Sequence, residues 1–211
     1  MGFHWDDLYR EDDYERRIYL GDESMADYLE TFLARFGPVD DVVSVGCGPG
    51  VVPFELAERY PDLPITGLDY AETIVADNRT LAAERGLENL SFAVDALPDL
   101  ATDRRFDLVY CVATLFFVAD AARAIESLYD LVRPGGYLVV NYPNEHTQEW
   151  AREADPEKRA DFSLVAAGEN TLSREEIESI LNTDSHDYWE AVDADDEEFV
   201  SPDLPMVYVR R

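Results

Sequence analysis

The sequence has 211 residues, 46% of them hydrophobic, which is enough to build the core of one α/β domain. Its 46 acidic residues outnumber 17 basic ones, giving a formal net charge of -29, and no basic stripe exists. This composition argues against a nucleic-acid partner, which needs clustered cations. No apolar run reaches the roughly 18–20 residues that span a bilayer. We therefore expect a cytoplasmic protein without membrane or nucleic-acid partners, and the composition leaves its oligomeric state open.

The acidic residues are spread through every segment, beside good hydrophobic patterning. This distribution disfavours a disordered acidic tail and favours a folded protein from a high-salt cytoplasm. Charges are screened within roughly 3 Å at molar salt, so self-repulsion is tolerable there. The composition therefore predicts a halophilic protein.

The first two thirds of the chain alternate between strand-like and helix-like patterns. The expected elements are a helix at 24–36, a strand at 42–45, a helix at 51–60, a strand from Ile65 to Asp69, a helix at 71–85, strands at 90–94 and 106–112, a helix at 121–132, a turn at 134–136 and a strand at 137–142. Strands separated by helices predict a doubly wound α/β fold, with a mostly parallel sheet and helices on both faces.

Beyond Tyr142 the pattern changes. Residues 145–160 are polar and helix-like, and Ser173 with Glu176 forms a capping box that opens a helix to about Leu181. The last 25 residues, 187–211, hold two strand-like pieces around an acidic loop, which we expect to pair as an antiparallel hairpin at the sheet edge. We expect a single domain, 1–211, with 1–23 as a lid segment and 143–172 as a substrate-side insertion.

Glycines follow the first strand in a G-x-G-x-G pattern, at Gly46, Gly48 and Gly50. Dinucleotide folds prefer G-x-G-x-x-G, and Val51 occupies the position of their last glycine. A nucleoside without phosphates fits this loop better, although a mere tight turn would look the same. Asp69 ends the second strand, 19 positions after Gly50, where a carboxylate can accept hydrogen bonds from ribose hydroxyls. We expect Asp69 to be surplus to the stability of the fold, as one acid among many.

Five segments in this order resemble the class I S-adenosylmethionine-dependent methyltransferases, over roughly residues 24–140. They are VVSVGCGPG, ITGLDYAE, SFAVDAL, FDLVYCVATLFFVAD and LVRPGGYLVV. The resemblance implies a seven-stranded sheet with a C-terminal antiparallel strand, and S-adenosyl-L-methionine as cofactor. The cofactor-binding residues that it implies are Gly46, Cys47, Gly48, Gly50, Asp69, Tyr70, Asp95, Ala96 and Cys111, with Asp69 on the ribose and Asp95 on the adenine.

The chain departs from the family at several positions. Many members have an acid where Ser44 stands, and related members often have histidines where Phe116 and Phe117 stand. The chain lacks the N-P-P-Y and Pro-Cys sequences of enzymes that methylate DNA bases. Cys47 and Cys111 lie in apolar contexts typical of buried structural cysteines, and the three histidines have no metal-ligand spacing, so we expect no metal.

These observations predict transfer of a methyl group to a small-molecule acceptor by in-line displacement. Such a reaction needs a general base only if the acceptor must lose a proton, and His146 and Tyr142 are the candidates. Tyr14, Tyr19 and Phe116 are expected to line the lid or the acceptor site. Two alternatives stay open: a non-catalytic S-adenosylmethionine-binding partner protein, and a nucleotide-dependent oxidoreductase.

Overall fold

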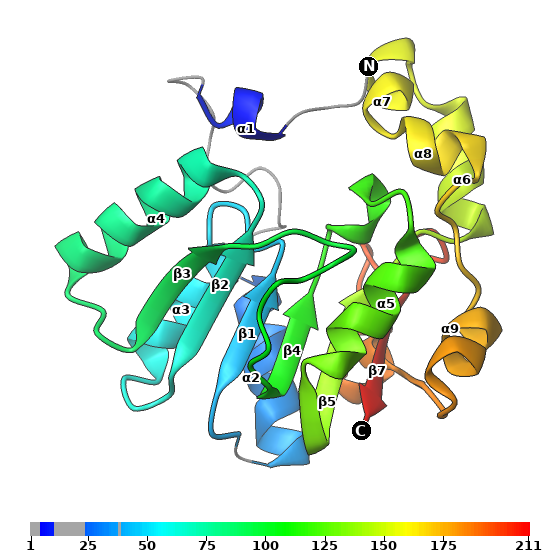
Figure 1. Ribbon diagram of the computed structural model, residues 1–211. Coiled ribbons are helices and arrows are strands. Elements are labelled where there is room, and N and C mark those ends of the chain that lie inside the picture. Colours follow the sequence, from blue (N-terminus) through cyan, green and yellow to red (C-terminus); the bar gives the residue numbers. More distant parts are fainter. Residues whose placement is uncertain (1–4, 11–23, 38) are drawn as a thin grey trace.

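A computed structural model describes residues 5–10, 24–37 and 39–211 of the chain. Its centre is one seven-stranded sheet in the order β3-β2-β1-β4-β5-β7-β6 (Figure 1). The strands are β1 (Val42–Val45), β2 (Ile65–Asp69), β3 (Leu90–Val94), β4 (Phe106–Cys111), β5 (Val132–Asn141), β6 (His186–Asp187) and β7 (Met206–Arg210). Neighbours from β3 to β5 pair in parallel, whereas β7 is antiparallel to both β5 and β6. The predicted fold class is confirmed, including its C-terminal antiparallel strand.

The helices cover both faces of the sheet. They are α1 (Trp5–Leu8), α2 (Ser24–Phe36), α3 (Val51–Arg59), α4 (Glu72–Arg85), the 3-10 turn η1 (Leu115–Phe117), α5 (Ala121–Asp130), α6 (Glu145–Glu153), α7 (Pro156–Asp161), α8 (Ser163–Ala167), α9 (Arg174–Leu181) and α10 (Tyr188–Ala191). One hydrophobic cluster joins the sheet to α2, α3, α4 and α10, and a second joins it to α5 and α9. Within the described ranges, no helix is long and apolar enough to cross a membrane.

Two predicted elements differ from the structure. The turn expected at 134–136 lies inside β5, where the pairing with β4 is irregular between Phe106 and Leu108. Gly136 there lies against the Asp107 carbonyl, leaving no room for a Cβ, so the strand continues through a bulge. The terminal hairpin keeps only two residues on its first strand, because the next residues fold into α10. Tyr188 and Trp189 of α10 are both buried, and a short helix brings them to the core together.

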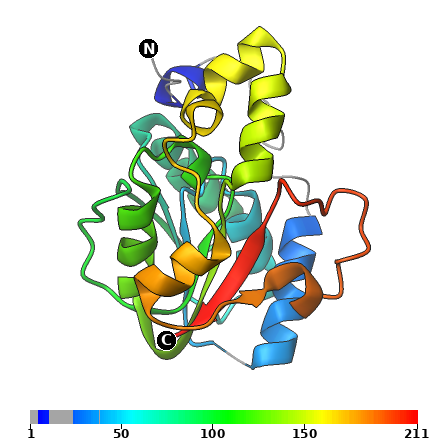
Figure 2. The same ribbon diagram turned by 90° about the vertical axis from the view of Figure 1, so that its right-hand side faces the viewer.

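The segment expected as a substrate-side insertion forms α6, α7 and α8. Figures 1 and 2 both show these helices, with α1, at the same end of the sheet. This is the end where the parallel strands finish and where β1 lies between β2 and β4, the point at which strand order reverses. Ligands bind at such a switch point in open α/β sheets. The fold therefore predicts a ligand site at this end of the sheet.

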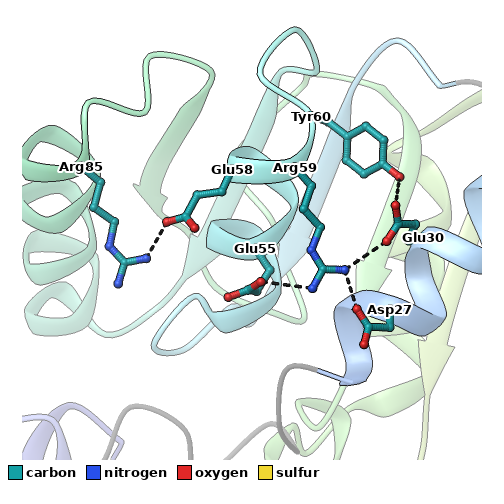
Figure 3. Close-up of polar contacts among 7 residues, drawn as sticks. All are labelled: Asp27, Glu30, Glu55, Glu58, Arg59, Tyr60 and Arg85. Atoms are coloured by element: carbon teal, nitrogen blue, oxygen red, sulfur yellow. Dashed lines mark hydrogen bonds and ion pairs between the residues drawn. The ribbon is translucent and has the colours of Figure 1, made fainter.

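Arg59 of α3 holds three carboxylates at once, whereas Arg85 of α4 holds one, that of Glu58. Figure 3 shows Arg59 of α3 with Asp27 and Glu30 of α2, at 2.5 and 3.1 Å, and with Glu55 of its own helix at 3.2 Å. The Tyr60 hydroxyl donates to Glu30 as well, and burial raises the pKa of Tyr60 to about 12. One cation thus serves three acids, and the cluster keeps a net negative charge.

We expect the thermal midpoint of unfolding to rise by roughly 10 °C between low and molar KCl. For a domain of this size such a rise corresponds to about 3–5 kcal/mol. The chain carries a net charge of -29 and even the ion-paired Arg59 cluster is negative, so salt relieves more repulsion than it weakens attraction. Scanning calorimetry at a series of KCl concentrations measures this directly. A midpoint that does not change with salt would contradict the halophilic interpretation.

Candidate active site

The loop between β1 and α3 owes its shape to its glycines. Gly46, Gly48 and Gly50 all have positive φ angles, of 67°, 49° and 76°. Side chains strongly disfavour this left-handed region, so the G-x-G-x-G spacing follows from the backbone path. Gly46 also lies so close to Thr114 that a Cβ there would overlap the threonine side chain. The loop is therefore held against the segment that follows β4.

Two buried polar side chains fix the same loop from β2 and α4. Asp69, 6% exposed, accepts a hydrogen bond from the Gly48 amide at 2.8 Å and another from the Ala71 amide at 3.0 Å. Asn78, fully buried in α4, donates to the Gly48 carbonyl at 2.8 Å. The expectation that Asp69 is surplus to stability is wrong, because its carboxylate ties the glycine loop to the start of α4. Nothing in the helical pattern of α4 singled out Asn78.

A cavity of about 410 Å³ opens over this loop. Six of the predicted cofactor residues line it: Gly46, Gly48, Asp69, Tyr70, Asp95 and Ala96. Gly50, Cys47 and Cys111 do not, and both cysteines are buried. Burial raises the pKa of the Cys111 thiol to about 12, so it stays protonated and unreactive at neutral pH. The strand ends thus place most, but not all, of the predicted set around one space.

Asp95 shapes the far wall of this cavity. Its carboxylate accepts from three backbone amides, those of Ala96, Ala101 and Thr102, at 2.8–3.0 Å. These bonds fold the chain after β3 into a loop that brings Leu97 to the cavity wall. The contact with adenine expected for Asp95 stays a prediction.

Helix α1 contributes residues that the lid prediction did not select. Trp5 and Tyr9 line the cavity, and the Trp5 amide donates to the Tyr70 hydroxyl at 2.9 Å. The Trp5 ring stacks on Tyr9 with centroids 5.9 Å apart and meets Phe117 edge-on at 4.9 Å. Tyr14 and Tyr19, which were expected to line the lid, lie outside the described residues.

A second cavity, of about 600 Å³, adjoins the first and shares Trp5, Ala113 and Phe117 with it. Phe116 lines this second space, beside residues of α6, α10 and the loop before β7. Ala113 stands at the junction with a φ of 56°, an unfavourable angle for a residue with a side chain. The buried amide of Asn141, at the end of β5, accepts from the Ala113 N–H at 3.2 Å and holds it there. Sequence patterns gave no signal for this pair.

Over residues 39–190 the sequence matches the protein family described as "Methyltransferase domain". The chain belongs to this methyltransferase family. Among curated relatives, trans-aconitate 2-methyltransferase of Deinococcus radiodurans is 35% identical over 109 residues, which cover 52% of this chain and 40% of that protein. A malonyl-[acyl-carrier protein] O-methyltransferase of Ilyobacter polytropus is 27% identical over 151 residues, 70% of this chain and 56% of that protein. The chain spans about half the length of these curated relatives.

Two solved structures show how far along the chain the structural likeness extends. A methyltransferase of Haloferax volcanii, solved with the Trm112 methyltransferase activator, aligns over 97% of this chain and 96% of its own, with a TM-score of 0.66 at 20% identity. PKMT2 of Rickettsia typhi, solved in complex with AdoHcy, aligns over 60% of this chain and 27% of its own, with a TM-score of 0.51 at 25% identity. The first likeness concerns the fold alone.

The two residues considered as bases lie away from both cavities. His146 is an exposed residue of α6, 3.9 Å from Glu145, and Tyr142 is buried in the cluster under α5 and α9. Neither lines either cavity. Burial raises the pKa of Tyr142 to about 12. In the part of the chain that the structure describes, no cluster of metal-ligating side chains occurs.

Asn170 holds η1 in place at the boundary of the two cavities. This buried side chain donates to the carbonyl oxygens of Leu115, Phe116 and Val118, at 2.9, 3.0 and 3.2 Å. In Asn170→Asp a carboxylate of the same size would face three carbonyls, so we expect a loss of at least about 2 kcal/mol in unfolding free energy. Denaturant unfolding of this variant and of Asn182→Asp, at an exposed helix end, provides the comparison. Equal stabilities would show that η1 does not depend on Asn170.

Proposed function

We propose that this protein transfers a methyl group from S-adenosylmethionine, bound in the first cavity, to a small-molecule acceptor in the second. The observation that carries the proposal is the junction of the two cavities at the switch point of the sheet, beside the glycine loop. Family membership supports the reaction type, and S-adenosylmethionine is the cofactor of such domains.

The residues around the first cavity fit this cofactor. The glycines let the backbone approach a ligand closely, and Gly46 and Gly48 face the space directly. Asp69 supplies a carboxylate at the cavity wall, and carboxylate oxygens accept hydrogen bonds from hydroxyls such as those of a ribose. Leu97 and Val118 line the cavity beside Asp95, and their apolar side chains suit contact with an adenine ring. We assign the ribose to Asp69 and the adenine to the Asp95 side.

When bound, S-adenosylmethionine supplies an electrophilic methyl carbon on a positively charged sulfur. The acceptor's electron pair forms the new bond as the carbon–sulfur bond breaks, and the departing pair stays on sulfur. The protein therefore needs no nucleophile of its own; it must align the acceptor and exclude water. Trp5 and Phe117 stand at the boundary of both cavities, and Ala113 fixes the opening between them. We propose that α1 serves as the lid over the cofactor.

Proton removal, where the acceptor requires it, falls to a different residue from those first considered. Among the described residues that line the second cavity, Asp203 is the one with an ionisable side chain. It accepts from the Ser201 hydroxyl at 2.5 Å. An acceptor with its own lone pair needs no base, and one that ionises would pass its proton to Asp203 or to water.

Two measurements test the proposal. Calorimetry should show that S-adenosylhomocysteine binds at least about 100-fold more tightly than NAD⁺, a difference of about 2.7 kcal/mol. Labelled S-adenosylmethionine, incubated with a panel of small molecules, should then yield a labelled product. Tighter binding of NAD⁺ would favour the oxidoreductase alternative. Tight S-adenosylhomocysteine binding without transfer to any of a broad panel would favour the non-catalytic alternative.

A further inference from the structure

Aromatic rings form much of the wall of the second cavity. In one series of contacts, Phe117 lies 5.2 Å from Phe162, and Phe162 meets Trp150 edge-on at 5.2 Å. In another, Trp189 meets Phe199 edge-on at 5.4 Å. All five of these residues line the cavity, and they come from η1, α6, the α7–α8 junction, α10 and the loop before β7. Segments distant in sequence thus present rings to one space.

Trp150 and Phe199 are both 40% exposed, which is unusual for side chains of this size. Both line the cavity, so part of each ring faces this space. Large apolar side chains left in contact with water at a concave site indicate a ligand that covers them. Burying such surface contributes about 25 cal/mol per Å².

The charges around this cavity are as informative as its rings. No arginine, lysine or histidine occurs among its described lining residues, and Asp203 is their single ionisable group. A ligand carboxylate placed among these described residues would lose water without gaining a cation from them, which costs several kcal/mol. A neutral group incurs no such cost, and a cation can lie over the aromatic faces near Asp203.

The polar groups of the lining are already engaged by the protein. Asn141 accepts from the Ala113 amide and donates to the Pro205 carbonyl at 3.0 Å. The Thr147 hydroxyl accepts from the Asn144 amide at 3.0 Å and donates to the Asp203 carbonyl at 2.8 Å. These bonds hold the cavity wall together, and they leave little hydrogen-bonding capacity to replace the water around an anion.

We propose that the acceptor is an aromatic compound without negative charge, either neutral or an amine, held among the rings of the second cavity. This inference rests on the proposed function, since it assigns the acceptor class of the same site. It separates this protein from the relative named for trans-aconitate, a tricarboxylate whose recognition would require cations. Methylation of an amine acceptor uses its neutral form, and Asp203 stands where it can receive the proton.

A matched series of probes tests the charge preference. The protein, saturated with S-adenosylhomocysteine, is titrated with 2-naphthamide, 2-naphthylmethylamine and 2-naphthoate in molar KCl, which suppresses the long-range field of the net charge. We expect the amide and the amine to bind at least about tenfold more tightly than the acid, a difference of 1.4 kcal/mol. Equal or tighter binding of the acid, or no binding of any probe at millimolar concentration, overturns the proposal.

Two charge variants separate the cavity from the rest of the acidic surface. Asp203→Asn should reduce the preference for the amine over the amide, whereas Asp196→Asn, at an exposed acid of the same loop, should leave it unchanged. A third variant, Phe162→Ala, should weaken all three probes alike while S-adenosylhomocysteine affinity stays constant. If the wild-type protein does not bind S-adenosylhomocysteine, the proposed function itself fails. Failure of the acceptor proposal and failure of the proposed function are therefore distinguishable.

Discussion

Replacing Asp69 with alanine should lower both the affinity for S-adenosylhomocysteine and the stability of the protein. Affinity should fall by at least about tenfold, because charge-assisted hydrogen bonds to ribose hydroxyls are worth roughly 1.5–3 kcal/mol each. Unfolding free energy should fall by about 2–3 kcal/mol, because the buried carboxylate also holds the amides of Gly48 and Ala71. Calorimetry and denaturant unfolding in molar KCl measure the two effects.

Because Asp69 also holds the glycine loop, a weaker affinity alone would not show that it touches the ribose. The 2′,3′-dideoxy analogue of S-adenosylhomocysteine separates them. Wild-type protein should prefer the parent ligand, and Asp69→Ala should lose that preference. Asp77→Ala, at an exposed acid of α4 away from both cavities, removes one charge as a control and should change neither affinity nor preference. If Asp69→Ala discriminates between the ligands as the wild type does, the ribose lies elsewhere.

The fold followed from the sequence where one physical signal dominated. Apolar periodicity defined α2 at Ser24–Phe36, and the capping box at Ser173 defined α9 from Arg174 to Leu181, as observed. The Pro134–Gly136 turn failed because proline and glycine mark bulges as well as turns, and the outcome depends on the strand alongside. The antiparallel pairing of the terminal hairpin was predicted correctly, but the length of its first strand was not, since the burial of Tyr188 and Trp189 in a helix is decided by tertiary contacts.

Some residues of the candidate site could be predicted from the sequence and others could not. Residues at the ends of strands were predictable, because the carboxyl ends of parallel strands meet at one edge, and Gly46, Gly48, Asp69 and Asp95 line one cavity. Residues that support this edge by hydrogen bonding to backbone groups were not predictable. Asn78, Asn141 and Asn170 are buried amides that hold turns and loops, and each looks in sequence like an ordinary polar residue.

The base candidates His146 and Tyr142 illustrate a different limit. Both follow β5 closely, at the correct edge of the sheet, so nearness in sequence favoured them. Orientation decided otherwise, because Tyr142 turns into the cluster under α5 and His146 lies on the outer surface of α6. Successive side chains of a strand point to opposite faces of the sheet, and a helix that begins a few residues later turns its side chains in further directions. Position in the chain therefore does not show which side chain faces a ligand.

The second large effect is expected from Gly46→Ala, which should reduce S-adenosylhomocysteine affinity by at least about tenfold. An added Cβ would overlap the side chain of Thr114, whose hydroxyl lies 3.0 Å from the Val112 carbonyl and 3.3 Å from the Gly46 carbonyl and can donate to either. Relief of the overlap requires movement of the glycine loop or of the segment after β4, and both line the first cavity. Affinity should therefore fall together with stability.

Gly86 supplies a closely matched control for this variant. Its φ of 68° nearly equals the 67° of Gly46, but nothing lies within 4 Å of the position of its Cβ. Gly86→Ala should then show the conformational cost alone, about 1–2 kcal/mol of stability, with unchanged ligand affinity. The double variant Gly46→Ala, Thr114→Gly removes the overlapping side chain and should recover part of the lost affinity. If Gly46→Ala binds S-adenosylhomocysteine as tightly as Gly86→Ala does, the cofactor does not rest on the glycine loop, and its assignment to the first cavity fails.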